Sequence, residues 1–223
     1  MGTLYLVATP IGNLKDITLR ALETLKTANL IYAEDTRVAR KLLSRYGIGA
    51  PVRRYDEHSH TRGFTEIRDM LIQGMAVAVV TDAGTPAIAD PGSRLVTAIR
   101  TALPAVPIVA VPGPSAITAA LSVAGVPAER FTFLGYPPAK KGRNTFFSSL
   151  STITVRPLVI YESPHRLLKT LNALASILGD KALIVVAHEL TKVHEEVWSG
   201  EVGDAPGRFT GPRGRGEFVL IIP

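Results

Sequence analysis

The sequence predicts an α/β fold made of two unlike halves. In the first half, short apolar runs alternate with segments of helical periodicity, which is typical of a parallel sheet covered by helices. In the second half, three apolar runs near the C-terminus are joined by turns, which indicates a mixed sheet. A rigid Pro-Gly-Pro turn at residues 112–114 separates the two patterns. We therefore expect two domains, residues 1–111 and 115–223, with a cleft between them.

The first half should contain five strands, each leading into a loop. They are expected at residues 4–8, 30–33, 51–55, 77–80 and 106–111. Asp16 is expected to cap a helix that carries Leu19, Leu22 and Leu25 on one face. A basic helix containing Arg40, Lys41 and Arg45 should end at Gly47. Two further helices are expected through Ile67 and Leu71, and through Leu95 and Ile99.

The second half should begin with a helix capped by Ser115 and continue with strands at residues 131–134 and 158–161. Leucines at helical spacing predict a helix from Leu167 to Leu178. Three strands are then expected at residues 182–187, 193–199 and 217–222. Between Trp198 and Gly216 the glycines and prolines exclude a long helix.

The loop after the fourth expected strand is the most informative segment. It runs from Thr81 to Gly92 and is rich in Gly, Pro and Asp. Loops that join a strand to a helix usually have about 2 to 6 residues. An ordinary strand-to-helix turn, with Asp as the helix cap, is the simpler alternative, but it would not need a loop longer than that. The length and stiffness of this loop favour a functional role, because ligands of open α/β sheets bind beyond the carboxyl ends of the strands.

Composition limits the function classes. With no cysteine among 223 residues, disulfides, thiolate metal sites and a cysteine nucleophile are excluded. No apolar run approaches the roughly 18 residues of a membrane span, and the N-terminus lacks a signal-peptide pattern, so we expect a soluble, cytoplasmic protein without membrane contact. The net charge of +6 favours an anionic partner, nucleic acid first, although a soluble surface alone could carry it. Neither a Gly-x-Gly-x-x-Gly nor a Walker motif is present.

The histidines do not predict a metal site. His188 and His194 are six residues apart, whereas the zincin motif needs four, and we expect them to be surface or hairpin residues. His58 and His60 could share a metal, but the sequence offers no third ligand, so a solvated loop is preferred. We predict no metal.

The basic and the acidic residues near these loops each allow more than one interpretation. The segment Lys140, Lys141 and Arg143, with Tyr136 and Phe146 nearby, could hold a phosphate backbone or be a solvated loop. Arg213 and Arg215 allow the same pair. Carboxylates adjoin several expected loops and could be general bases, helix caps or ion-pair partners. These carboxylates are Glu34, Asp35, Asp82, Asp90 and Glu162.

Seven short motifs, in order from the N-terminus to the last strand, carry a resemblance to a known family. They are Ala8-Thr9-Pro10-Ile11-Gly12-Asn13, Ala33-Glu34-Asp35-Thr36-Arg37, Asp82-Ala83-Gly84-Thr85-Pro86 with Asp90-Pro91-Gly92, Pro112-Gly113-Pro114-Ser115-Ala116, Tyr161-Glu162-Ser163-Pro164-His165-Arg166-Leu167, Glu189-Leu190-Thr191-Lys192 and Gly216-Glu217-Phe218-Val219-Leu220. Together they resemble the ribosomal RNA small-subunit methyltransferase I family, which has the tetrapyrrole-methylase fold of class III S-adenosylmethionine (SAM) methyltransferases.

The resemblance implies a homodimer of two-domain chains that binds SAM in the interdomain cleft. The implied substrate is small-subunit (16S) rRNA, free or in the 30S subunit, and the acceptor is the ribose 2′-hydroxyl of a cytidine in the decoding region. The implied cofactor contacts are Pro10, Ala83, Gly84, Thr85, Ile88, Ser115, Ala116, Tyr161, Leu190 and Thr191.

Methyl transfer from a sulfonium is an in-line displacement, so the site needs alignment and exclusion of water more than strong acid or base groups. A ribose hydroxyl is a poor nucleophile, and Glu162, Asp35 and His58 are the candidate bases. RNA phosphates would be held by Arg37, Lys140, Lys141, Arg143 and Arg166.

Two departures from the family pattern affect these expectations. His188 stands where the family commonly has Arg, which replaces a fixed charge with a titratable one. His58-Ser59-His60 stands where His-Asn-Glu is expected. Two other functions fit the same fold: C-methylation of a porphyrin precursor, and ribosome assembly without catalysis.

Overall fold

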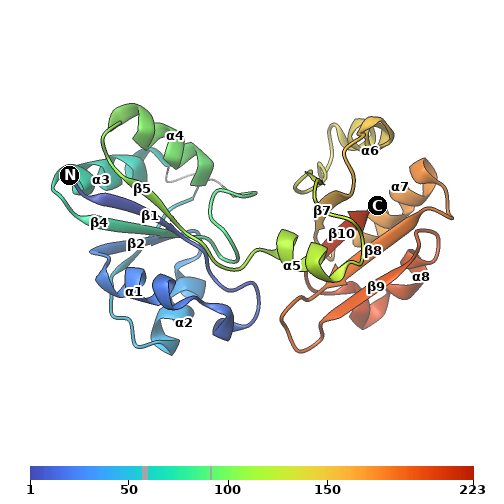
Figure 1. Ribbon diagram of the computed structural model, residues 1–223, viewed down its shortest axis with the longest axis horizontal. Helices are drawn as coiled ribbons and strands as arrows, with labels where there is room; N and C mark the ends of the chain where they lie inside the picture. Colours follow the sequence, from blue (N-terminus) through green and yellow to red (C-terminus); the bar gives the residue numbers. More distant parts are fainter. Residues whose placement is uncertain (57–59, 91) are drawn as a thin grey trace. The chain divides into compact units, whose positions relative to one another are not determined.

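A computed structural model describes residues 1–56, 60–90 and 92–223, apart from the side chain of residue 60. The chain forms two compact units, Met1–Ser115 and Ala116–Pro223, and each contains a five-stranded sheet (Figure 1). No helix in the described part of the chain is long and apolar enough to cross a membrane.

The sheet of the first unit is entirely parallel. Its strands are β1 (Thr3–Val7), β2 (Leu30–Ala33), β3 (Val52–Arg54), β4 (Ala76–Val80) and β5 (Ile108–Val111). Their spatial order is β3-β2-β4-β1-β5, and every pair is parallel. This confirms the parallel half that the alternating pattern predicts. β2 and β4 are apolar almost throughout because both faces of a parallel sheet are covered.

Helices cover both faces of this sheet (Figure 1). α1 (Leu19–Thr27) and α2 (Thr36–Arg45) pack on one face, where Leu25, Leu42 and Leu43 join one core cluster. α3 (His60–Ile72) and α4 (Gly92–Ala102) pack on the other, where Leu71 and Ile99 join a second cluster.

The predicted start of α1 is wrong by two residues. Asp16 ends a short 3₁₀ turn, η1 (Leu14–Asp16), and the helix cap is Thr18, whose Oγ1 accepts a hydrogen bond from Ala21 N at 3.1 Å. Leu19 is 79% exposed, and Ile17 is buried in its place. Asp16 and Thr18 are both good helix caps. We infer that the helix starts after Thr18 because Ile17 and Ala21 are then buried.

The second unit has the mixed sheet that the sequence predicts. Its strands are β6 (Thr132–Phe133), β7 (Leu158–Glu162), β8 (Leu183–His188), β9 (Glu196–Glu201) and β10 (Phe218–Ile222). The order is β6-β7-β10-β8-β9; β6 is parallel to β7 and the other pairs are antiparallel.

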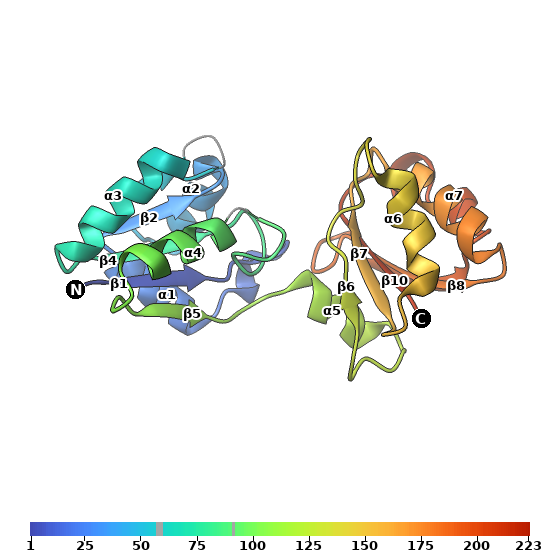
Figure 2. The same cartoon turned by 90° about the horizontal axis from the view of Figure 1, so that it is seen from above.

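The helices of this unit are α5 (Ala116–Val123), α6 (Arg143–Ser149), α7 (Leu167–Leu178) and α8 (Ala205–Arg208). Two short 3₁₀ turns, η2 (Leu150–Thr152) and η3 (Gly211–Gly214), complete it. α6 and α7 lie side by side (Figure 2). The segment between Trp198 and Gly216 contains only α8 and η3, as its glycines and prolines predict.

Strand register assigns the side chains of this sheet to two faces. Phe218 is paired with Glu162 on one side and His188 on the other, so these three share a face. Phe218 belongs to the core that α7 covers. Tyr161 is paired with Val219 and therefore points to the opposite face, where its hydroxyl lies near the backbone of Ile117 in α5.

Of the two positions expected for His188, the surface is wrong and the hairpin is confirmed, because His188 pairs with Glu196 in the β8–β9 hairpin but is buried. It is the last residue of β8, is only 4% exposed, and stacks on Phe218 with ring centroids 4.5 Å apart. Its Nε2 lies 2.5 Å from Arg215 O. His194 is exposed, as expected, and precedes β9, which begins three residues later than predicted.

Candidate functional site

The loops that follow β1 and β4 are joined at the carboxyl edge of the parallel sheet. Thr9 N donates to Gly84 O at 2.9 Å, and Gly84 N donates to Thr9 O at 3.0 Å. Thr9 Oγ1 also donates to Thr81 O at 3.1 Å. The two loops therefore form one backbone assembly at the edge where such sheets bind ligands.

The loops after β5 and β2 connect to the same assembly. Thr85 Oγ1 donates to Pro114 O at 3.2 Å, and Asp35 N donates to Asp82 Oδ1 at 2.9 Å. Four of the sequence motifs thus meet at one edge of one sheet. We call this group of loops, residues 8–13, 34–37, 81–92 and 112–115, the loop edge; its description leaves out residue 91.

Asp90 holds the long loop in its observed shape. Its carboxylate accepts hydrogen bonds from Ala87 N at 2.8 and 2.9 Å and from Gly92 N at 2.6 Å. Burial raises the pKa of Asp90 above its usual range, and the two backbone donors oppose that shift. Ala87 and Ala89 have φ values of 71° and 60°, a left-handed conformation that non-glycine residues rarely adopt.

A second loop carries the same kind of backbone strain. In the loop after β8, Glu189 has a φ of 50° and Thr191 a φ of 67°. Throughout the described part of the chain, every non-glycine residue with a left-handed φ lies in one of these two loops. Such conformations cost about 1 to 3 kcal/mol each and cluster at ligand sites. Both loops are among those that the sequence singles out for the cofactor.

The side chains at the loop edge differ in accessibility. Pro10 and Gly84 are buried, Thr85 and Ser115 are half-buried, and Ala83 is exposed. Ile88 is 46% exposed, so a large apolar side chain lies at the surface of the long loop.

Asp35 serves as a helix cap and an ion-pair partner. Its Oδ1 accepts a hydrogen bond from Arg37 N at 2.8 Å and caps α2, and Arg37 Nη2 lies 2.6 Å from its Oδ2. The hydrogen bonds from Arg37 lower the pKa of Asp35 to about 2. Such a carboxylate accepts a proton poorly at neutral pH, which argues against the general-base role expected for it.

Glu34 has the opposite electrostatic environment. Glu34 is exposed, but partial desolvation of its carboxylate raises its pKa, and so do the negative charges of Asp82, Asp90 and Asp56. It lines a small pocket at the loop edge together with Tyr55 and Asp90. A carboxylate with a raised pKa in a pocket is a candidate functional group. The sequence placed Glu34 directly after β2 but gave no reason to prefer it to Asp35.

In the second unit, Glu162 is the centre of a buried polar network. It is 2% exposed and accepts hydrogen bonds from Thr170 Oγ1 and, at 2.7 Å, from Ser163 N. Arg166 Nη2 forms an ion pair with it at 3.0 Å. Glu162 lies on the opposite face of the sheet from Tyr161, and both of its carboxylate oxygens already have hydrogen-bond or ion-pair partners. The structure therefore argues against its expected role as a base.

Arg143 belongs to the same network. It is 5% exposed, its Nη2 donates to Thr170 Oγ1 at 2.7 Å, and its guanidinium carbon lies 4.9 Å from the Phe147 ring centroid. Gly142, with a φ of 83°, turns the chain so that Arg143 points inward at the start of α6. This burial contradicts the phosphate contact expected for Arg143.

The other predicted RNA contacts differ in their exposure and in whether another residue pairs with their charge. Lys140 and Lys141 are exposed and have no ion-pair partner among the described residues. The Arg166 side chain is 25% exposed, donates to Pro137 O at 2.9 Å and lies 5.9 Å from the Tyr136 ring centroid. Arg37 is exposed, although Asp35 compensates its charge.

Tyr161 is the aromatic centre of its face. Its ring lies 4.8 Å from the ring of Phe133 and 5.4 Å from that of Tyr136. Burial raises the pKa of Tyr161 to about 12, so its hydroxyl stays protonated at neutral pH. It can hold a ligand by packing and hydrogen bonding but cannot act as a base there.

An ion-pair network fixes the loop after β8. Lys192 Nζ lies 2.7 Å from Glu189 Oε1 and 2.8 Å from Glu217 Oε2, and Glu217 N donates to Glu189 Oε1 at 2.9 Å. Leu190, between the strained residues, is 8% exposed and Thr191 is half-buried.

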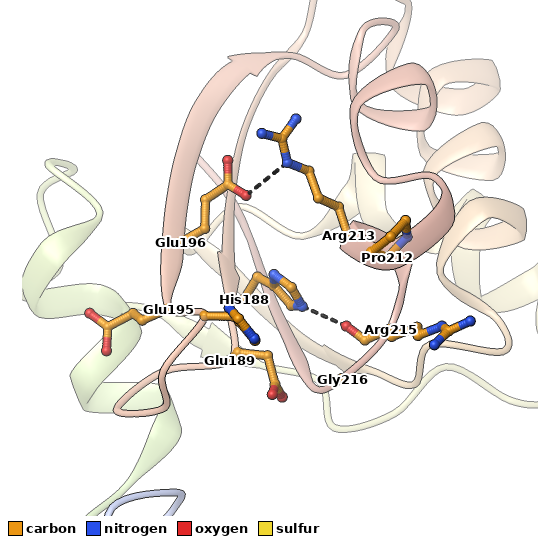
Figure 3. Close-up of a pocket in the computed structure, with 9 residues that line it drawn as sticks. His188, Glu189, Glu195, Glu196, Pro212, Arg213, Arg215 and Gly216 are labelled. Carbon is orange, nitrogen blue, oxygen red and sulfur yellow. Dashed lines mark hydrogen bonds and ion pairs between the residues drawn. The ribbon is translucent and has the colours of Figure 1, made fainter.

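A pocket of about 590 Å³ lies beside this loop and is lined by His188, Glu196, Arg213 and Arg215, among others (Figure 3). Arg213 Nε is 3.8 Å from Glu196 Oε2. None of the residues implied by the family resemblance as cofactor or RNA contacts lines the pocket, but Arg213 and Arg215 do, for which the sequence allows either phosphate binding or a solvated loop. Within the described residues, no group of three or more potential ligand side chains is placed to hold a metal. His58, the third candidate base, lies outside the described residues.

Comparisons with known proteins agree with this architecture. A sequence model of the family described as Tetrapyrrole (Corrin/Porphyrin) Methylases matches residues 3–206. The uroporphyrin-III-C-methyltransferase of Thermus thermophilus superimposes with a TM-score of 0.72 at 21% identity, over 100% of this chain and 94% of that one. Cobalt precorrin-4 methyltransferase gives a TM-score of 0.72 at 19% identity, over 99% and 94%. The two sheets and the loop edge therefore define a tetrapyrrole-methylase fold.

Sequence relatives narrow the class. The chain is 44% identical to ribosomal RNA small subunit methyltransferase I of Synechocystis sp., over 100% of this chain and 79% of the relative. It is 41% identical to the protein of that name from Thermotoga maritima, over 100% and 98%, and 47% identical to that of Mesorhizobium japonicum, over 98% and 74%. The chain belongs to the ribosomal RNA small subunit methyltransferase I family.

Proposed function

We propose that this protein transfers a methyl group from SAM to the ribose 2′-oxygen of a cytidine in the decoding region of small-subunit rRNA. The observation that carries the proposal is sequence identity of 41% and 44%, along the whole chain, to two relatives named as small-subunit rRNA methyltransferases. The loop edge and the strained loop after β8 support it, because they supply the ordered backbone that a nucleoside cofactor needs.

The proposed cofactor contacts come from both units: Pro10, Ala83, Gly84, Thr85, Ile88 and Ser115 from the first, and Ala116, Tyr161, Leu190 and Thr191 from the second. Two observations fit such a ligand. Gly84 has a φ of 81° and its backbone is fixed by Thr9, and Ile88 offers exposed apolar surface. Bound SAM supplies an electrophilic methyl group on a sulfonium.

The contribution of the protein would be alignment and exclusion of water, with a base to take the ribose proton. Glu34 is the candidate base that the electrostatics favour, since Asp35 is held ionised by Arg37 and Glu162 is buried. A carboxylate with a raised pKa takes up a proton more readily at neutral pH. A role for His58 stays a prediction.

RNA would be held through phosphates by Arg37, Lys140 and Lys141, which are exposed. Arg166 would contribute through the quarter of its side chain that is exposed, whereas the buried Arg143 would not reach the RNA. The homodimer that the family resemblance implies is also part of this proposal. Sedimentation equilibrium of the purified protein tests it, with twice the chain mass as the expected result.

The test of the function is methyl transfer from radiolabelled SAM to three substrates: 30S subunits from cells that lack this activity, naked 16S rRNA, and a tetrapyrrole precursor. Label in either RNA substrate supports the proposal, and the better acceptor identifies the natural substrate. Label in the tetrapyrrole alone would assign C-methylation instead. SAM binding without transfer to any of the three, or no SAM binding at all, would contradict the proposal.

A further inference from the structure

The exposed side of α2 carries four cations. Arg37, Lys41 and Arg45 recur at spacings of four residues and share one face of the helix, while Arg40, one residue before Lys41, lies about 100° around the helix from it. All four side chains are exposed. The helix contains no acidic residue. We call these four side chains the α2 stripe.

Most of this charge is uncompensated. The side chain of Arg37 is paired with Asp35. The side chains of Arg40, Lys41 and Arg45 have no ion-pair or hydrogen-bond partner in the part of the chain that the structure describes. Favourable interaction with the helix dipole accounts for a cation in the last turn, such as Arg45. It does not account for Arg40 and Lys41 in the middle of the helix.

The position of the stripe relates it to the loop edge. α2 begins directly at the loop edge, because Asp35 caps the helix and also donates its backbone N–H to Asp82. With a rise of about 1.5 Å per residue, the stripe extends roughly 12 Å away from that edge. Both features belong to the same compact unit, so their spacing is fixed.

The chemistry of the stripe fits a row of phosphates and not a lipid surface. A membrane-surface helix presents large apolar side chains beside its cations. Here the apolar residues of α2 that pack inward, Leu42 and Leu43, are in the core, and Val38 is the single large apolar side chain exposed on the helix. Guanidinium and ammonium groups with only one large apolar side chain, Val38, exposed beside them match a nucleic-acid backbone better than a lipid surface.

We propose that the α2 stripe is the track along which the rRNA strand next to the target nucleotide is held, through contacts of Arg40, Lys41 and Arg45 with consecutive phosphates. This inference rests on the proposed function. Arg40, Lys41 and Arg45 lie outside the motifs that carry the family resemblance, whereas Arg37 belongs to one of them. Contacts of these side chains with phosphates would not depend on the base sequence of the RNA.

The test is the salt dependence of binding to a decoding-region RNA in the full-length double variant Arg40→Gln/Arg45→Gln. Each phosphate contact contributes roughly 0.7 (single strand) to 0.9 (duplex) to the slope of log K against log salt, so the slope should become shallower by about 1.4 to 1.8. Affinity at about 0.1 M salt should fall on the order of 10-fold or more. SAM affinity should not change.

Two controls make the result specific. Arg100→Gln/Arg130→Gln removes the same charge from two other exposed arginines without ion-pair partners among the described residues, and its slope should equal that of the wild type. Arg40→Lys/Arg45→Lys keeps the charges and should retain the slope. A thermal melt of each variant verifies folding.

The outcomes separate this inference from the proposed function. An unchanged slope in the folded Gln variant, or an equal loss in the Arg100/Arg130 control or in the Lys variant, overturns the track even if the wild type methylates 30S subunits. A shallower slope restricted to the Gln variant supports the track, even if the wild type transfers no methyl group to RNA, and in that case the proposed function alone fails.

Discussion

Tyr161 and Glu162 are neighbours in the sequence, yet their side chains lie on opposite faces of the sheet in the second unit. Tyr161 points to the face with α5, and Glu162 points to α7, where it bonds to Thr170. One motif thus serves two purposes. Its tyrosine is available to a ligand, while its glutamate joins α6, α7 and β7 through Arg143, Thr170 and Arg166.

Glu162→Gln should therefore reduce stability and leave the chemistry almost unchanged. Breaking a buried ion pair costs about 3 to 5 kcal/mol, and Arg166 keeps a quarter of its side chain in water, so we expect roughly 2 to 4 kcal/mol. Urea unfolding measures the loss, and methyl transfer at a temperature where both proteins are folded measures the rate. Thr170→Val should cause a comparable loss. A fall in kcat above 100-fold in folded Glu162→Gln would restore it as a base.

Glu34→Gln should impair the reaction while the protein stays folded. A general base contributes typically 10²- to 10⁴-fold, and a loss of kcat in that range is expected. Because partial desolvation and the neighbouring Asp82 and Asp90 raise the pKa of Glu34, the wild-type rate should rise with pH through that raised pKa and then level off. The variant should lack this rise. A wild-type profile that persists in Glu34→Gln would exclude the assignment.

Asp35→Asn should change stability in a pH-dependent way. The hydrogen bonds from Arg37 hold the folded-state pKa of Asp35 at about 2, below its ordinary value of about 3.9. The ionised group thus stabilises the fold above about pH 4, and this contribution is lost as the pH falls toward 2. Urea unfolding of wild type and variant should differ at pH 7 and converge near pH 2. A constant difference across this range would contradict the role of the carboxylate charge.

Gly84→Ala and Gly74→Ala should separate backbone strain from ligand binding. Both glycines have left-handed φ values, 81° and 84°, so an added Cβ should cost about 1 to 2 kcal/mol at either position. Gly74 has open space around it, and Gly84 has Ile11 and Pro114 at ordinary contact distance. Calorimetry should show weakened SAM binding only in Gly84→Ala. Equal SAM affinity in the two variants would remove Gly84 from the cofactor site.

Much of the architecture could be predicted from the sequence because its signals are local. β-branched runs such as residues 77–80 mark buried strands, and glycines and prolines exclude a long helix before Gly216. The length of the loop from Thr81 to Gly92 also marked it as unusual, and the left-handed Ala87 and Ala89 agree with that prediction.

The errors came from properties that depend on distant residues. Which face of a strand is covered decides whether Glu162 and His188 are buried, and the alternation of residue types does not reveal it. Arg143 follows two exposed lysines, but the left-handed turn at Gly142 directs it inward. The raised pKa of Glu34 arises from partial desolvation and from Asp82 and Asp90, which lie far away in the sequence.

The most direct test of the central claim is the chemical position of the transferred methyl group. 30S subunits labelled by the wild-type protein would be digested to nucleosides, analysed by mass spectrometry, and mapped by resistance of the modified linkage to alkali. We predict 2′-O-methylcytidine at one decoding-region position, absent when Gly84→Trp replaces the wild type. Label on a base, on another nucleotide or at scattered sites would contradict the account.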